Sequence, residues 1–182
     1  MRGFTWSKET LEMALRFRLA FGGSGYEFFR EQIPMFPAPR TLSFHLENLR
    51  FEPHGILGEI VDMMKLKCET MSDLEKDVGI LFDEMKIEAG VEYEPALRKW
   101  IGEVTLPEHC GVATHALVFM IAGISSSPRF KQTVAYYFSG DKTDGYVYGP
   151  IIRDILHAMK FVGLKVNFVS SDMGSPNRAF WN

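Results

Sequence analysis

The spacing of apolar residues predicts short helices over the first part of the chain. Apolar positions recur at helical intervals after Ser7, whose hydroxyl suits an N-cap. The glycine-rich stretch 22–25 is expected to end this helix, and a second short helix follows over residues 26–32. Thr41 is then expected to cap a third helix that runs to Leu49. Three such helices are compatible with a helix-turn-helix.

The second part of the chain predicts an α/β fold of the α+β type, built on a mixed sheet with flanking helices. A helix is expected over residues 55–76. The continuous apolar run Val78–Phe82 indicates a strand that is buried on both faces and ends at Asp83. Three strands, a helix and a last strand are expected to follow, over residues 99–105, 115–124, 131–138, 149–161 and 164–171.

The composition is that of an ordinary globular protein. The chain has 182 residues, of which 46% are hydrophobic and 24% are charged, so disordered and fibrous classes are excluded. Its longest apolar run, Ala116–Ile124, falls well short of the roughly 20 residues that a membrane helix needs. Cys68 and Cys110 are too few for a disulfide framework. We therefore expect a soluble intracellular protein with no membrane partner.

Charge is distributed unevenly along the chain. The net charge is −3, but residues 1–50 carry +2, residues 51–110 carry −8 and residues 111–182 carry +3. Any nucleic-acid contact is therefore expected at the two ends. The third predicted helix displays side chains that can reach phosphates or base edges, namely Arg40, Thr41, Ser43, His45 and Asn48. A helical bundle that only packs on the next domain would have a similar pattern, so both alternatives stay open.

Two aspartates follow apolar strands and are the strongest candidates for chemistry. Asp83 closes the run that begins at Val78, and Asp172 closes the last predicted strand. A carboxylate at the end of a buried strand is costly unless it is hydrogen-bonded, paired or coordinated. If the two strands are neighbours, the carboxylates converge, and a divalent cation such as Mg²⁺ would allow both to stay ionised. The alternative is that each aspartate caps a turn, since Asp172 precedes Gly174 and Pro176.

Two other kinds of site have weaker signals. Asp83 and Glu84 after an apolar strand also suit a nucleotide hydrolase, but the sequence has no phosphate loop of the GxxxxGK[ST] type. His109, Cys110 and His115 lie close in sequence, but a zinc site usually needs a fourth ligand at a defined spacing.

Several separated motifs resemble one family. The segment Asp83–Ile87, followed by Glu92–Glu94, is similar to the first signature of P-element-type transposases and their THAP-containing relatives. The similarity extends upstream into the predicted helices and covers about residues 6–182. Downstream it continues, in order, through Ala116–Met120, Lys131–Gln132, Ala135–Phe138, Gly163–Val166, Asp172, Gly174 and Asn177.

The resemblance implies an RNase H-like catalytic domain preceded by a DNA-binding helix-turn-helix. The expected division is residues 1–53 for the helix-turn-helix module and residues 54–182 for the first part of the RNase H-like domain. In this family, three acidic residues hold two divalent metal ions for DNA cleavage and strand transfer. Asp83 matches the first and Asp172 the second, so both are expected to be catalytic and to bind metal. Glu84 is expected on the opposite face of its strand and is not counted as a ligand.

The sequence departs from the family pattern in ways that limit the expected activity. The third acid, a GTP-binding insertion and the THAP zinc finger have no counterpart in these 182 residues, and Thr133 stands where the family more often has proline. With two of three ligands, we expect weak binding of Mg²⁺ or Mn²⁺ and no GTP binding by this chain. We also expect no transposase activity of the chain alone, because such chemistry depends on a preorganised site.

Two functions are consistent with these features. The first is a fragment or truncated copy of a P-element-like transposase, whose parent cleaves DNA and transfers strands with two metal ions. The second is a domesticated, non-catalytic derivative that binds DNA or a protein. The expected partners are DNA, as transposon ends or target, and in addition a second copy of the chain or a protein. The expected localisation is nuclear, with the cytoplasm as the alternative.

Overall fold

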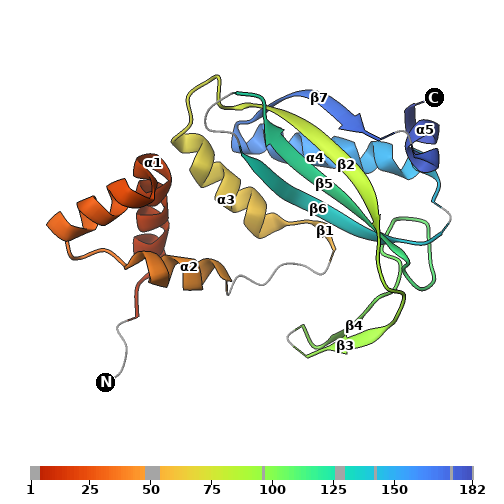
Figure 1. Ribbon diagram of the computed structural model, residues 1–182, viewed down its shortest axis with the longest axis horizontal. Helices are drawn as coiled ribbons and strands as arrows, with labels where there is room; N and C mark the ends of the chain where they lie inside the picture. The colour runs from red at the N-terminus through yellow and green to blue at the C-terminus, as the bar shows by residue number, and fades with distance from the viewer. Residues whose placement is uncertain are drawn as a thin grey trace.

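The fold consists of a small helical module and a mixed β-sheet with helices on one face (Figure 1). The structure is a computed structural model that describes residues 5–47, 54–95, 97–125, 130–141, 143–172 and 174–181. Each of the two parts has its own buried cluster of apolar side chains. The predicted class, a mixed sheet with flanking helices, is therefore confirmed. The domain boundary expected between residues 53 and 54 lies at the edge of a stretch outside the described residues and stays a prediction.

The helical module begins with α1 (Lys8–Gln32), which is two helices joined at a kink. Gly22 has φ 72° and ψ 177°, a positive-φ conformation that glycine adopts without a steric penalty. The Ser7 side chain accepts a hydrogen bond from the Thr10 amide at 3.2 Å, so the predicted N-cap is confirmed. The helix break also lies within the predicted stretch, although the second helix resumes directly after Gly22 and not at residue 26.

The third helix, α2 (Pro39–Glu47), begins earlier than expected. Thr41 lies inside its first turn and is not the N-cap, because the amides of Thr41 and Leu42 both donate to the Ala38 carbonyl, at 2.9 and 3.2 Å. Proline is compatible with the first helical position, which needs no amide hydrogen. The expected end at Leu49 lies outside the described residues.

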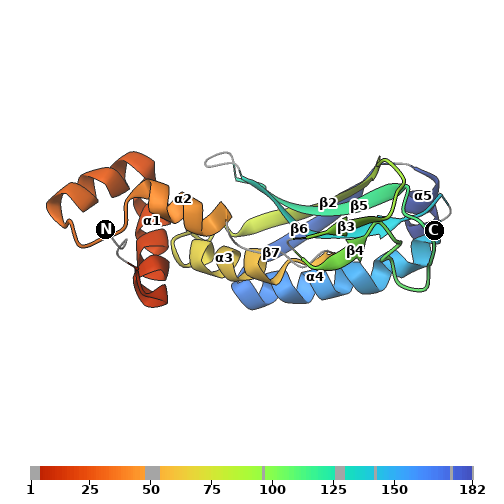
Figure 2. The ribbon, with the colours of Figure 1, turned by 90° about the horizontal axis from the view of Figure 1, so that it is seen from below.

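The second part is a five-stranded sheet in the order β1-β6-β5-β2-β7. The strands β2 and β7 pair in parallel and the other neighbours pair antiparallel, so the sheet is mixed. Two helices, α3 (Gly58–Glu69) and α4 (Tyr148–Val162), lie on the same face (Figure 2). The strands of the sheet are β1 (Gly55–Ile56), β2 (Asp77–Lys86), β5 (His115–Gly123), β6 (Lys131–Ser139) and β7 (Lys165–Ser171).

The two faces of the sheet differ in burial. In β2, the alternate residues Val78, Ile80 and Phe82 are buried in one cluster with the apolar side of α4. On the opposite face, Leu81 is half-buried and Met85 is exposed. The expectation that this strand is buried on both faces is therefore wrong for the described part of the chain, where no helix covers the second face (Figure 2).

The helix expected over residues 55–76 is shorter, because another element precedes it. Gly55, with φ 92°, and Ile56 form β1, which pairs with β6, so α3 begins only at Gly58. The helix ends at Thr70, whose hydroxyl donates to the Lys67 carbonyl at 2.9 Å. A polar residue that bonds its own helix end in this way competes with continuation of the helix.

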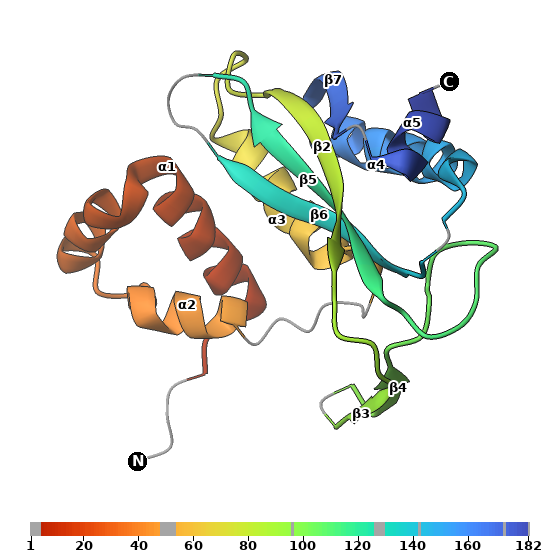
Figure 3. The same ribbon diagram turned by 45° about the vertical axis from the view of Figure 1, so that its right-hand side comes forward.

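The strand expected over residues 99–105 belongs to a separate hairpin. Here β4 (Lys99–Ile101) pairs with β3 (Glu92–Glu94), and the hairpin projects from the end of the main sheet (Figure 3). Gly102 ends β4 with φ 111°, and its backbone approaches the Gly90 carbonyl so closely that no side chain could fit. This close approach stops the strand short of its predicted end.

Candidate functional site

The sheet register brings the two predicted acidic residues together. The last paired positions of the parallel strands are Phe82 in β2 and Ser171 in β7. Asp83 and Asp172 are the next residue of each chain segment, and neighbouring strands lie about 4.8 Å apart. The condition that their strands are neighbours is thus met. The expectation that Asp83 ends its strand is wrong, however, because β5 pairs with β2 as far as Lys86.

Asp83 projects from the uncovered face of the sheet. It is exposed, and its Oδ1 atom accepts a hydrogen bond from the Glu84 amide at 2.8 Å. An open, mostly apolar cavity of about 270 Å³ lies beside it, with Leu81, Val118 and Met120 in its lining. The Asp83 carboxylate is therefore accessible, and it stands at the edge of an apolar surface.

Asp172 is held more firmly than Asp83. Its Oδ1 atom accepts two hydrogen bonds, from the Gly174 amide at 2.9 Å and from Nδ2 of Asn177 at 2.5 Å. These donors favour the charged carboxylate, so the Gly174 amide first and then the Asn177 side chain hold the pKa of Asp172 below its ordinary value. A side chain at Gly174 would place its Cβ atom only 3.0 Å from the same Oδ1 atom.

A short helix that the sequence did not predict fixes the loop after Asp172. This helix, α5 (Ser175–Trp181), packs Phe180 edge-on against Phe82 of β2, with ring centroids 5.8 Å apart. Nε1 of Trp181 donates to the Ser171 hydroxyl at 2.9 Å, and that hydroxyl donates in turn to the Asp172 carbonyl at 2.9 Å. Ser171 before Asp172 and the helix α5 after it therefore contact each other, and α5 packs on the sheet.

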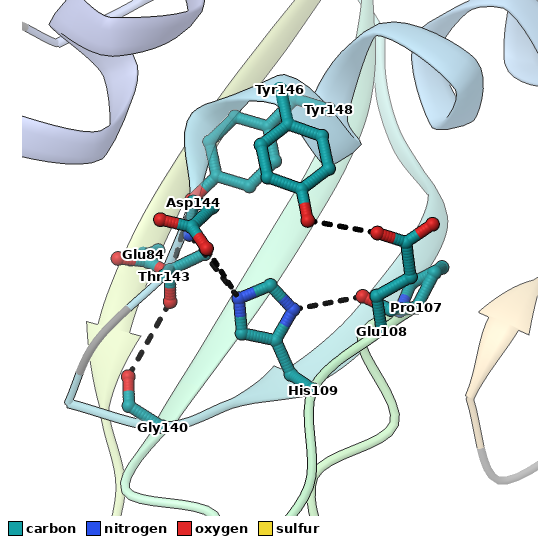
Figure 4. Close-up of polar contacts among 9 residues, drawn as sticks. All are labelled: Glu84, Pro107, Glu108, His109, Gly140, Thr143, Asp144, Tyr146 and Tyr148. Atoms are coloured by element: carbon teal, nitrogen blue, oxygen red, sulfur yellow. Dashed lines mark hydrogen bonds and ion pairs between the residues drawn. The ribbon is translucent and has the colours of Figure 1, made fainter.

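Glu84 points to the opposite face from Asp83, as expected. Its Oε1 atom accepts hydrogen bonds from the hydroxyls of Ser139 at 2.9 Å, Tyr148 at 3.3 Å and Thr143 at 3.5 Å. Figure 4 shows Glu84, Thr143 and Tyr148 next to the 3₁₀ turn η1 (Gly145–Val147) that precedes α4. Burial, together with the Glu84 charge, raises the pKa of Tyr148 above its ordinary value. Glu84 thus joins β2 to β6 and α4.

His109 belongs to a neighbouring set of contacts in Figure 4. Its Nδ1 atom lies 2.8 Å from the Pro107 carbonyl, and its Nε2 atom accepts a hydrogen bond from the Asp144 amide at 3.2 Å. Both ring nitrogens therefore have protein partners. Within the described ranges, no three or more histidine, cysteine, aspartate or glutamate residues gather closely enough to hold a metal ion.

The donors at Asp83 and Asp172 fit part of a divalent-metal site. Each carboxylate uses Oδ1 for hydrogen bonds, and Oδ2 of each makes no hydrogen bond to the residues that the structure describes. Carboxylate oxygens are the ligands that Mg²⁺ and Mn²⁺ prefer. Two carboxylates supply fewer oxygen atoms than such ions need, so any ion held here would keep water or take ligands from elsewhere.

The residues predicted to contact DNA lie on α2 in different environments. Arg40 is exposed, whereas Thr41, Ser43 and His45 are partly buried. The Ser43 hydroxyl accepts a hydrogen bond from Nη1 of Arg18 at 3.3 Å, which joins α2 to α1. Asn48 lies outside the described residues. Arg40 is therefore the most accessible cation of this predicted surface.

Comparison with known proteins identifies the class to which the chain belongs. Residues 52–182 match the family model described as TNP-like, RNase H N-terminal domain. The chain belongs to this family, which confirms its predicted relationship to P-element-type transposases; the match does not include a THAP domain.

A solved structure extends this similarity to the helical module. The Drosophila P element transposase strand transfer complex superposes with a TM-score of 0.54 and 21% sequence identity, over 99% of this chain. The chain spans 36% of the length of that transposase chain. At this identity the similarity establishes the fold, an RNase H-like sheet with an appended helical module. No match was found among curated proteins. No helix in the described residues is long and apolar enough to cross a membrane.

Proposed function

We propose that this chain supplies two acidic ligands, Asp83 and Asp172, of a divalent-metal site that acts on DNA phosphodiesters in a transposase-related protein. The parallel register of β2 and β7 carries this proposal, because it sets the two aspartates at adjacent positions of one sheet edge. Membership of a transposase-like RNase H family supports the same chemistry.

The residues of this chain would hold the ion and orient the reacting groups. Asp172 has one oxygen fixed by two donors and Asp83 has one fixed by a backbone amide, which leaves the second oxygen of each for the ion. A bound divalent cation supplies Lewis-acid activation of water or of a DNA 3′-hydroxyl. The face around Asp83 is open, so a DNA strand can approach this edge of the sheet.

The proposed site is tested by Mn²⁺ binding, measured by electron paramagnetic resonance on the intact chain. We expect weak binding, roughly 10⁻³ M, since the carboxylate set is sparse. Asp83→Asn and Asp172→Asn should each abolish it. Asp77→Asn is the matched control, because Asp77 begins the same strand at its opposite end. Wild-type binding in both site variants, with their folds intact by circular dichroism, would contradict the metal site.

DNA is the proposed partner, and the helical module is its proposed binding surface. Arg40 is exposed on α2, where it could contact phosphate, and Thr41, Ser43, His45 and Asn48 follow it along the sequence. The similar Drosophila structure is a strand transfer complex, which supports a DNA partner here. A DNA partner in turn favours a nuclear location. Absence of metal binding together with retained DNA binding would favour the second function, a non-catalytic DNA-binding derivative.

A further inference from the structure

We propose that Asn177 is the positioning residue for Asp172: its side-chain amide holds the carboxylate in one orientation, with Oδ2 left for the metal. The inference deepens the proposed function and rests on it. Asn177 lies on α5, five residues beyond Asp172, and its Nδ2 atom donates to Oδ1 of Asp172 at 2.5 Å. The Gly174 amide donates to the same oxygen atom. Two donors on one oxygen hold the Asp172 side chain in one rotamer and so determine where Oδ2 points.

The environment of Asn177 is unusual for a residue that serves packing alone. Its side chain is only 3% exposed, and its Oδ1 atom is buried without a hydrogen-bond partner among the described residues. A buried acceptor without a partner is costly, and an apolar residue of similar size would avoid that cost. If the Asn177 amide were turned over, its own Oδ1 atom would face the Asp172 carboxylate, and two acceptors would meet. The negative charge on Asp172 therefore determines that the NH2 group of Asn177 faces it.

The position of Asn177 is itself fixed by the surrounding contacts. The Arg178 amide donates to the Gly174 carbonyl at 2.9 Å, which closes the first turn of α5. The Trp181 indole donates to Ser171, directly before Asp172, at 2.9 Å. The first bond fixes the start of α5 and the second connects α5 to the end of β7, so the amide of Asn177 stays within reach of the carboxylate.

The two acids differ in the donors that hold them. Asp83 accepts one bond, from the next backbone amide, whereas Asp172 accepts a second bond from a buried side chain. Removing the Asn177 amide would therefore release Asp172 to rotate. Outer residues that orient a metal ligand typically change metal affinity by about 10-fold to 100-fold when they are substituted.

The test uses Asn177→Leu, which keeps the branching and the number of heavy side-chain atoms but removes the amide, and Asn177→Ala, in case the larger leucine disturbs α5. Asn167→Leu is the matched control, because Asn167 is an exposed residue of β7, the same strand that leads to Asp172. The first readout is the χ1 rotamer of Asp172 in the metal-free protein, from NMR three-bond couplings. The second readout is Mn²⁺ affinity.

We expect a single Asp172 rotamer in the wild type and in the control, and averaged rotamers in both Asn177 variants. Mn²⁺ affinity should fall about 10-fold or more in those variants. A single rotamer in both Asn177 variants, with Mn²⁺ affinity equal to that of the wild type, would overturn the inference. If the wild type binds no Mn²⁺, the proposed metal site fails, but the rotamer measurement still decides whether Asn177 positions Asp172.

Discussion

Substitution of Tyr148 by phenylalanine tests whether the Glu84 contacts stabilise the strand that carries Asp83. Tyr148 is fully buried, and its hydroxyl donates to Oε1 of Glu84 at 3.3 Å. The Tyr148→Phe change removes this hydroxyl and keeps the ring, which packs edge-on against Phe82 with centroids 5.7 Å apart. Its effect on stability therefore measures the hydrogen bond and the titration of the hydroxyl.

The expected magnitude follows from the partner and the distance. Hydrogen bonds to charged groups contribute about 1.5–3 kcal/mol. The bond is long at 3.3 Å, and the Ser139 hydroxyl remains on the same oxygen at 2.9 Å, so the lower end applies. At pH 7 we expect Tyr148→Phe to lower the free energy of unfolding by about 1.5 kcal/mol.

The pH dependence of this difference has a definite sign. Burial and then the Glu84 charge raise the pKa of Tyr148, so the folded protein keeps its proton where an unfolded tyrosine, with a pKa of about 10, loses it. The contribution of the Tyr148 hydroxyl to the free energy of unfolding is fully present below pH about 10. Above that pH it falls by about 1.4 kcal/mol for each pH unit. The stability difference between wild type and Tyr148→Phe should therefore shrink to near zero by about pH 11.

Urea unfolding, followed by circular dichroism from pH 7 to pH 11, measures this difference. Other tyrosines with raised pKa values, such as Tyr26 and Tyr137, are present in both proteins, so their effects cancel. Tyr93→Phe is the matched control, because its ring is half exposed on the β3-β4 hairpin, away from Glu84. A difference for Tyr148→Phe that stays the same at pH 11 as at pH 7 would refute the reasoning.

Two further predictions concern DNA binding and packing. Arg40→Ala should weaken duplex DNA binding and reduce the slope of log affinity against log salt concentration by about one unit. Arg153→Ala on α4 is the exposed control. An unchanged slope for Arg40→Ala would exclude Arg40 as a phosphate contact. Gly79→Ala should destabilise the fold by about 1 kcal/mol, because the new Cβ atom would overlap the outer atoms of the Phe168 ring, and this half-exposed ring must turn away from its present rotamer. Gly149→Ala, which meets only ordinary contacts, is its control in urea unfolding, and equal stability of both variants would contradict this packing.

Elements with a strong apolar period could be predicted from the sequence. The helix α4 buries Ile151, Ile155 and Met159 at helical spacing and ends at Gly163, and both features are visible in the chain. The seven-residue helix α5 (Ser175–Trp181) could not be predicted in this way. A helix of that length is not stable on its own, and tertiary contacts such as that of Phe180 with Phe82 stabilise it.

The same reason explains why the role of Asn177 could not be predicted from residue type and spacing. The residue lies among the positions that resemble the transposase family, but only the fold of α5 brings its amide to Asp172. The residue spacing alone does not distinguish a buried asparagine that donates to a carboxylate from one that caps a turn. The positions of the two aspartates could be predicted in part, because Asp83 follows the apolar run Val78–Phe82 and Asp172 follows the last predicted strand. The point at which β2 ends could not, because β5 continues to pair with it as far as Lys86.

The change from apolar to acidic residues after Phe82 marks a change in strand neighbours, not the end of the strand. Up to Phe82, β2 is paired with β5 on one side and with β7 on the other. From Asp83 to Lys86, β5 continues on one side, and β7 has already ended at Ser171 on the other. Asp83 lies at this step and on the face that no described helix covers, so water or a cation can reach its carboxylate. The step in the sheet edge, together with the uncovered face, therefore leaves Asp83 where a metal ion could bind.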